Sequence, residues 1–133
     1  MVDVAFERTK GALVNAGQMD VYEDLNLLDG GTVIQQSSKS TTVILNTTVG
    51  QITMNNAGLT AGSEVTFTVT NSKVGAQDVV IVNHGSVGTA GTYFAQCTAI
   101  ATGSFKITLS NLTAGTLSEA IVIHFAVIGG SSS

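Results

Sequence analysis

The chain has 133 residues and a formal net charge of −4, and its charged fraction of 11% compares with about 25% in an average soluble domain. Its length fits one domain that can bury a core of its own. The sequence contains no basic cluster, no run of about 18 apolar residues and no second cysteine, which argues against nucleic-acid binding, a membrane span and a disulfide framework.

Residues 1–30 differ from the rest of the chain in charge. They carry eight of the fourteen charged residues, six acidic and two basic, and so account for the whole net charge. Apolar side chains interrupt the acids at Tyr22, Leu25, Leu27 and Leu28. Two interpretations stay open: a partly disordered leader, or a non-β arm that docks on a partner through these four side chains. No basic stretch followed by an apolar one begins the segment, so we expect no secretory signal.

From Thr32 onward, apolar residues recur with a period of two, which is typical of strands. The clearest case lies within 64–71, where Val65, Phe67 and Val69 alternate with threonines. The strands predicted in chain order are 32–36, 42–46, 50–55, 64–71, 78–83, 93–101, 105–110 and 120–128. Segments rich in glycine and asparagine predict turns at 55–58, 59–62, 83–85 and 111–115.

Two of these runs, 78–83 and 120–128, are apolar on both faces of the predicted strand. Such a strand lies in the middle of a sandwich, or its outer face meets another subunit. We expect a subunit interface on one face of the last run or on the other. The candidate residues are Ile121, Ile123, Phe125 and Val127 on one face, and Val122 and His124 on the opposite face.

About eight short antiparallel strands at this spacing predict an all-β fold, either a β-sandwich or a barrel, and a jelly roll fits the strand count. The predicted organisation is an N-terminal arm at 1–30, a β-sandwich domain at 31–128 and a flexible Gly/Ser tail at 129–133. Residues 31–133 carry only six charges, three of each sign. A body with a hydroxyl-rich, nearly uncharged surface can pack against other proteins without desolvating ions, so we interpret it as one made for protein contacts.

Residues able to support catalysis or bind a metal are few. Cys97 and His124 could form a nucleophilic pair. However, the sequence places no cationic residue or helix N-terminus beside Cys97 to lower the pKa of its thiol. The alternative interpretation is that Cys97 is a small hydrophobic residue buried in the core. His84 is interpreted as a turn residue. One cysteine and two distant histidines do not supply the ligands of a metal site, and the acids between 20 and 29 lack the spacing of a calcium loop. We expect no catalytic, cofactor-binding or metal-binding residue and no enzyme activity.

Three stretches of the body carry a family pattern. They read GGTVIQQSSKSTTVILNTTVGQITMNNA at 30–57, LTAGSEVTFTVTNSKVGAQDVVIVNHGSVGTAGTY at 59–93 and GSFKITLSNLTAGTLSEAIVIHFAVI at 103–128. Together they resemble a group of small β proteins encoded by tailed bacteriophages and prophages. The pattern of that group runs GGTVTQ, a Ser/Thr-Lys-Ser-Thr run, GQITMNNA and an ending like LSEAxVIxFAVI. The resemblance covers residues 31–128.

The resemblance implies a structural virion protein, specifically a capsid decoration (cement) protein on the exterior of the head. Such a protein would be assembled in the host cytoplasm. Residues 1–30 fall outside the resemblance, and from their own pattern we expect them to bind the major capsid protein through Tyr22, Leu25, Leu27 and Leu28. We also expect a homotrimer, because shell lattices have local three-fold axes. No cofactor, nucleic acid or membrane is expected to bind. Two alternatives stay open: a tail-fibre or spike module that binds a host receptor, and a small jelly-roll hydrolase or isomerase, which would need a titratable cluster.

Overall fold

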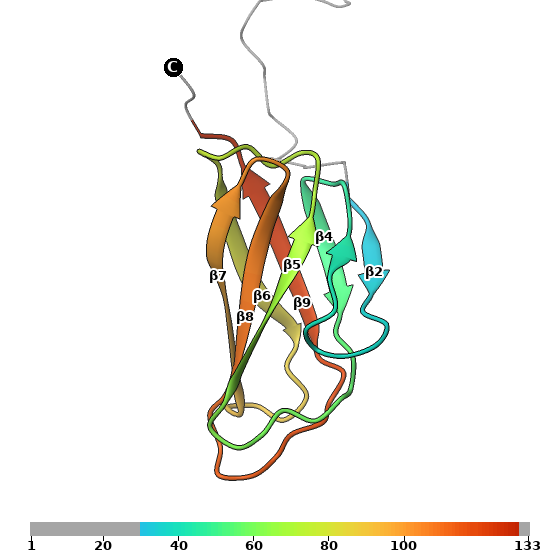
Figure 1. Ribbon diagram of the computed structural model, residues 1–133, viewed down its shortest axis with the longest axis vertical. Coiled ribbons are helices and arrows are strands. Elements are labelled where there is room, and N and C mark those ends of the chain that lie inside the picture. The colour runs from blue at the N-terminus through green and yellow to red at the C-terminus, as the bar shows by residue number, and fades with distance from the viewer. Residues whose placement is uncertain (1–29, 131–133) are drawn as a thin grey trace, which may run out of the picture.

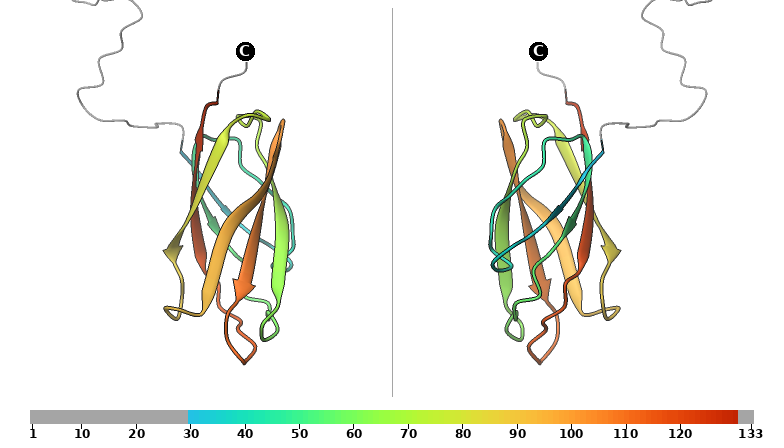
Figure 2. Two further views of the ribbon diagram at one scale, coloured as in Figure 1. Left: turned by 90° about the vertical axis from the view of Figure 1, so that its left-hand side faces the viewer. Right: turned by 90° about the vertical axis from the view of Figure 1, so that its right-hand side faces the viewer.

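The structure is a computed structural model that describes residues 30–130. The strands in this range are β2 (Thr32–Ile34), β3 (Val43–Ile44), β4 (Val49–Thr53), β5 (Glu64–Thr70), β6 (Val79–Ser86), β7 (Tyr93–Ala101), β8 (Ser104–Asn111) and β9 (Val122–Ile128). They form two four-stranded sheets that face each other across a core (Figures 1 and 2). The prediction of an all-β sandwich is therefore confirmed.

The first sheet has the strand order β2-β4-β9-β6, and the second has the order β3-β5-β8-β7. Strands β4, β9 and β6 pair antiparallel, as do β5, β8 and β7. The expectation of antiparallel pairing throughout is wrong for two pairs, because β2 is parallel to β4 and β3 is parallel to β5. In each pair the chain crosses to the other sheet and returns, which is the crossover that parallel neighbours need. These pairs also depart from an antiparallel jelly roll.

The predicted turn at 83–85 is wrong. Strand β6 continues through these residues to Ser86, and its register with β9 shifts between His84 and Ser86. The shift is a β-bulge at Gly85, where the absent side chain leaves room for the imidazole of His124 on the neighbouring strand. The glycine two residues after Asn83 therefore marks an irregular point within a strand, and a sequence pattern does not distinguish such a point from a turn.

The core lies between the two sheets and is made by the alternating inward side chains of nearly every strand. Phe105 of β8 and Phe125 of β9 meet across the sheets with ring centroids 5.1 Å apart and a 61° angle between their planes. An edge-to-face pair of this kind stabilises by about 0.5–1.5 kcal/mol beyond the area it buries. Gly50 of β4 makes this packing possible, because a Cβ there would lie 2.5 Å from ring carbons of Phe125.

Buried polar side chains tie the loops to the sandwich. Lys39 is 3% exposed, and its Nζ donates hydrogen bonds to the backbone oxygens of Asn55 and Glu119, the latter at 2.7 Å. Gln35 donates to the backbone oxygens of Lys39 and Thr41 and accepts from the backbone N–H of Asn55. These two side chains therefore connect the β2–β3 loop to the end of β4 and to the segment that enters β9.

Candidate functional site: the outer face of the first sheet

The outer face of the first sheet carries side chains whose types are not explained by packing within the sandwich. Alternation along each strand and the strand register together identify the side chains on this face. They are Thr32 and Ile34 of β2, Val49, Gln51 and Thr53 of β4, Val122, His124, Ala126 and Ile128 of β9, and Val79, Ile81 and Asn83 of β6. Below, this set is called the uncharged face.

None of the four strands that build the uncharged face contains a lysine, arginine, aspartate or glutamate. Aliphatic side chains gather at one end of it, because Val79 of β6 pairs directly with Ile128 of β9 and Ile81 pairs with Ala126. Val79 is 54% exposed, Ile81 47% and Ile128 46%. Single exposed hydrophobic residues are ordinary, but adjacent ones on a surface without charge are typical of a surface that binds protein.

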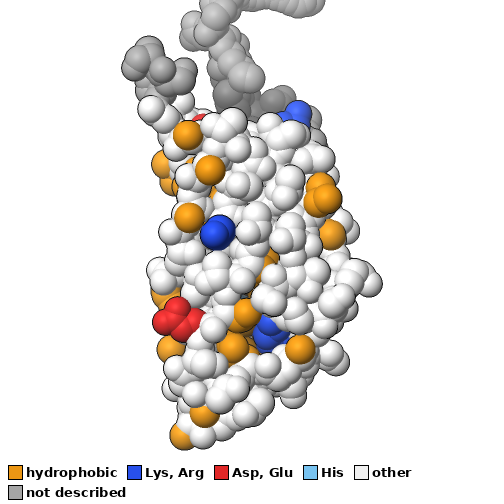
Figure 3. Space-filling view, viewed as in Figure 1, with side chains coloured by type: hydrophobic (Ala, Val, Ile, Leu, Met, Phe, Trp, Pro, Cys, Tyr) orange, Lys and Arg blue, Asp and Glu red, His pale blue; other side chains and the backbone are white. Residues whose placement is uncertain are grey.

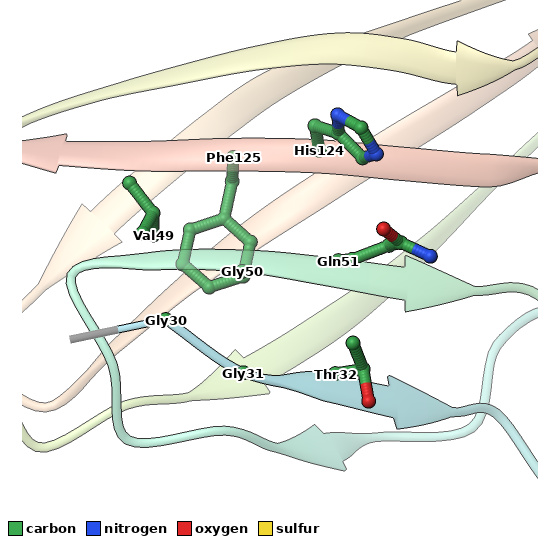
Figure 4. Close-up of a pocket in the computed structure, with 8 residues that line it drawn as sticks. All are labelled: Gly30, Gly31, Thr32, Val49, Gly50, Gln51, His124 and Phe125. Atoms are coloured by element: carbon green, nitrogen blue, oxygen red, sulfur yellow. The ribbon is translucent and has the colours of Figure 1, made fainter. Parts of the chain in front are cut away.

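A row of polar side chains crosses the middle of the same face. The register places Thr32, Gln51, His124 and Asn83 side by side on successive strands, and Figure 4 shows the side chains of the first three following one another across the sheet. Gly30, Gly31 and Gly50 leave a shallow hollow beside this row. None of the four polar side chains has a hydrogen-bond partner within residues 30–130. Residues 30–130 therefore leave the donors and acceptors of this row unused.

The second sheet presents a different outer face. Threonine hydroxyls bond to one another across it, with Oγ1 of Thr108 2.8 Å from Oγ1 of both Thr66 and Thr98. Glu64 and Lys106 supply charges on the same face. Figure 3 views this side and shows mostly uncharged polar groups and backbone, with hydrophobic side chains at separate places. Ile44 and Phe94 are also exposed on this face, at 64% and 49%. The second sheet therefore differs from the first in its charges and bonded hydroxyls, whereas both outer faces expose hydrophobic side chains.

The structure corrects part of the predicted subunit interface. The expected contact face around Ile121, Ile123, Phe125 and Val127 is wrong, because these side chains are 0–6% exposed and form the core of this chain. The opposite face, with Val122 and His124, points out of the sandwich and belongs to the uncharged face. The sequence left both faces open because each is apolar, and packing against the second sheet decides between them.

The run at 78–83 is also not buried on both faces. Strand β6 is an edge strand of the first sheet, with Val80 inside and Val79 and Ile81 outside. Of the two alternatives for such a run, the position in the middle of a sheet is therefore wrong for β6. An outer face that meets another subunit stays a prediction for this strand.

His84 lies on β6 rather than in a turn. It pairs with Ile123 of β9, whose side chain is in the core, so its own side chain points inward. Neither ring nitrogen has a hydrogen-bond partner in the described chain, although both are shielded from solvent. Burial lowers the pKa of His84 because the charged imidazolium loses its hydration. The fold therefore favours neutral His84.

Cys97 and His124 are not brought together. Cys97 lies on β7 of the second sheet opposite Ile107, so its thiol points toward the core, whereas His124 points outward from the first sheet. Burial raises the pKa of the Cys97 thiol, which disfavours the thiolate that a nucleophile requires. Within residues 30–130, no group of three or more His, Cys, Asp or Glu side chains is placed to hold a metal ion.

The predicted arm residues Tyr22, Leu25, Leu27 and Leu28 lie outside the described residues. Gly30, where the described chain begins, lines the hollow on the uncharged face. In the described part of the chain, no helix has the length and apolar character needed to cross a membrane. A comparison of the chain with protein-family models, with curated proteins and with solved structures finds no match.

Proposed function

We propose that this chain is a structural protein of a bacteriophage particle, a capsid decoration (cement) protein that binds the outer surface of the head and stabilises contacts between major capsid subunits. The observation that carries the proposal is the uncharged face. A shell protein is buried against neighbours for its working life, and burial of uncharged side chains avoids the desolvation cost that ions impose. The charges and the bonded hydroxyls lie on the second sheet, so in this proposal the second sheet is the side that faces water.

Two further features support this role. The resemblance of residues 31–128 to small β proteins of tailed phages concerns the part of the chain that folds into the sandwich. The buried polar residues that tie its loops to its strands, Gln35, Lys39, Asn71 and Asn111, suit a small rigid block. Nδ2 of Asn71 donates to the backbone oxygen of Thr47, and Nδ2 of Asn111 donates to those of Leu59 and Thr60, all in distant segments.

In the proposed assembly, the segment before Gly30 is the anchor on the major capsid protein, with Tyr22, Leu25, Leu27 and Leu28 as its contacts. Three copies would surround a local three-fold axis of the shell, because cyclic arrangements close without leaving free interfaces. The protein would be made in the host cytoplasm and would end up on the exterior of the virion. It would need no cofactor, and it would act by binding rather than by catalysis.

The proposal is tested with capsids that lack this protein. Full-length chain and a chain that begins at Gly30 are mixed with such capsids, and bound protein is measured after sedimentation. The expected result is that the full-length chain coats the heads and that the shortened chain, although folded, does not. Equal coating by both chains would exclude the anchor role of residues 1–29. Binding of the full chain to host cells or cell-wall polysaccharide, with none to capsids, would favour a receptor-binding module of the tail.

A further inference from the structure

We infer that residues 2–8 of this chain add to the open edge of β6 as a fifth strand of the first sheet, antiparallel to β6. The inference goes beyond the proposed function, because it concerns neither the anchor residues at 22–28 nor the uncharged face, and its test contains no capsid. It assigns an interaction surface to the edge of β6, and it names one segment of the chain as the occupant.

The strand register shows which backbone groups of β6 are used within the sheet. In an antiparallel ladder, pairs that exchange two backbone hydrogen bonds alternate with pairs that exchange none. The bond from the N–H of Val127 to the backbone oxygen of Thr48 continues the ladder between β4 and β9, so the odd-numbered residues of β9 bond to β4. By alternation, Ala126 bonds instead to its partner Ile81 on β6. The backbone groups of Ile81 are therefore used by β9.

The neighbours of Ile81 have the opposite orientation. Val80 and Val82 direct their N–H and C=O groups away from β9, and the described sheet has no strand on that side. Strand β6 spans eight residues without a charge or a proline, the side chains that commonly prevent an edge strand from pairing. Its register stays regular up to the bulge at Gly85. The edge therefore presents a ladder of backbone donors and acceptors that fits an extended segment.

A groove lies beside this edge, between the start of β6 and the second half of β7. It has a volume of about 390 Å³ and is lined by Asp78, Val80, Cys97, Ala99 and Ile100, among others. Asp78 is the charged residue of this lining. Hydrogen bonds from the backbone N–H groups of Gly75 and Gly130 lower the pKa of Asp78, so its carboxylate is charged at neutral pH. A strand placed here therefore meets an apolar wall and, at the start of β6, an anion.

Residues 2–8, which read VDVAFER, match both the edge and the groove. As a strand, this segment has Val2, Val4, Phe6 and Arg8 on one face and Asp3, Ala5 and Glu7 on the other. The first face is apolar and ends in a cation, as the groove is apolar and ends in an anion. The second face is mostly acidic, which is typical of the solvent side of a half-buried strand.

One register satisfies the side chains and the backbone together. If Arg8 lies opposite Asp78 in an antiparallel pair, Phe6 lies opposite Val80. Val80 is 8% exposed and points between the sheets, and residues opposite each other share a face, so Phe6 enters the groove. The same register pairs the open backbone groups of Val80, and those of Val82 two positions further, with the added strand.

The connection between this segment and the domain is long enough. Figure 1 shows the starts of β2 and β6 at the same end of the sandwich, and the register places Gly30 level with Ile81, three strands away. Three spacings of about 4.8 Å give about 14 Å. The connecting residues 9–29 have an r.m.s. span of roughly 25 Å as a flexible chain. The segment is therefore present at its own edge at a roughly millimolar effective concentration, which favours it over a second copy in dilute solution.

Amide hydrogen exchange of the full-length chain, measured by NMR, tests the inference. The N–H groups of Val80 and Val82 exchange fast at an open edge and slowly where residues 2–8 cover it. The N–H of Ile81, which bonds to β9, should stay protected in every variant. This reference separates loss of the added strand from unfolding of β6.

Phe6→Asp and Ala5→Asp form a matched pair of variants. Phe6→Asp places a carboxylate in the apolar groove, and Ala5→Asp places the same group on the solvent side of the segment. We expect Val80 and Val82 to be protected in the wild type and in Ala5→Asp, and their protection to fall at least about tenfold in Phe6→Asp. Arg8→Glu should also lower this protection, and Arg8→Lys should retain it, because only the former repels Asp78.

Three results would overturn the inference. The first is fast exchange at Val80 and Val82 in the wild type, and the second is equal protection in Phe6→Asp and Ala5→Asp. The third is protection that appears only at concentrations where sedimentation velocity gives a mass above the 13.6 kDa of one chain, since another copy would then supply the strand.

Discussion

The amine of Lys39 is expected to hold the ends of three segments together, and Lys39→Met tests this role. The substitution keeps an unbranched side chain of similar length, so packing along the stem is largely retained. It removes the donors that Nζ gives to the backbone oxygens of Asn55 and Glu119. Both acceptors belong to loops that border strands of the first sheet, so the loss acts directly on the connection between the β2–β3 loop and β4 and β9.

The magnitude follows from two opposing effects. A hydrogen bond from a charged donor contributes about 1.5–3 kcal/mol, and Lys39 makes two of them. Burial of the ammonium opposes this gain, and the lowered pKa of Lys39, caused first by desolvation and partly offset by the carboxylate of Glu119, shows its direction. Methionine removes the desolvation cost together with the hydrogen bonds. We expect a net loss of about 1–3 kcal/mol in the free energy of unfolding.

Urea denaturation of the wild type, Lys39→Met and Lys106→Met measures this loss. Lys106 is exposed on β8, so its substitution should change the free energy of unfolding by less than about 0.5 kcal/mol. The pKa of Lys39 is lower in the fold than its ordinary 10.5, so the unfolded chain binds more protons between these two values. The wild type should therefore gain stability relative to Lys39→Met as the pH rises through that window. A Lys39→Met chain as stable as the wild type at neutral pH would refute the reasoning.

Two further substitutions test other parts of the fold. The lowered pKa of His84 means that the unfolded chain binds more protons below about 6.5, so stability should fall as the pH drops from 6.5 toward that lowered value. Urea midpoints measured from pH 7.5 to pH 5 should show this loss of stability in the wild type and in His124→Gln, and a smaller loss in His84→Gln. Equal pH dependence in all three chains would contradict the attribution of the loss to His84. Gly50→Ala places a Cβ against the ring of Phe125 and should lower the free energy of unfolding by about 1–3 kcal/mol. Gly115→Ala, whose Cβ meets no atom within 4 Å, is its control in the same denaturation series, and equal effects of both substitutions would show that the Phe125 packing is not tight.

The period-two pattern predicted the strands well because each inward position meets the same core. In β5, for example, Phe67 and Val69 are buried and Thr66 and Thr70 are exposed, as the alternation requires. The pattern could not predict the parallel pairs. Between β2 and β4 the chain passes through β3 of the other sheet, and this crossover does not change the local periodicity of the sequence. Strand order and pairing direction depend on contacts between distant segments.

The candidate site was predicted only in part for a related reason. The sequence identified apolar residues on both faces of 120–128 but gave no basis for choosing the face that packs on the second sheet. It gave no sign that Lys39 is buried, because the acceptors of its amine lie 16 and 80 positions away along the chain. The four strands that form the uncharged face lack charged residues, but only the strand order brings them into one sheet.

The number of copies of this chain in purified virions, measured against the major capsid protein, tests the proposed role most directly. Quantitative mass spectrometry of intact particles gives this ratio. A decoration protein should be present in numbers comparable to the major capsid protein, because only the shell offers that many sites. A few copies per particle would contradict the decoration role and point to the tail, and absence from the particle would contradict a structural role in the virion altogether.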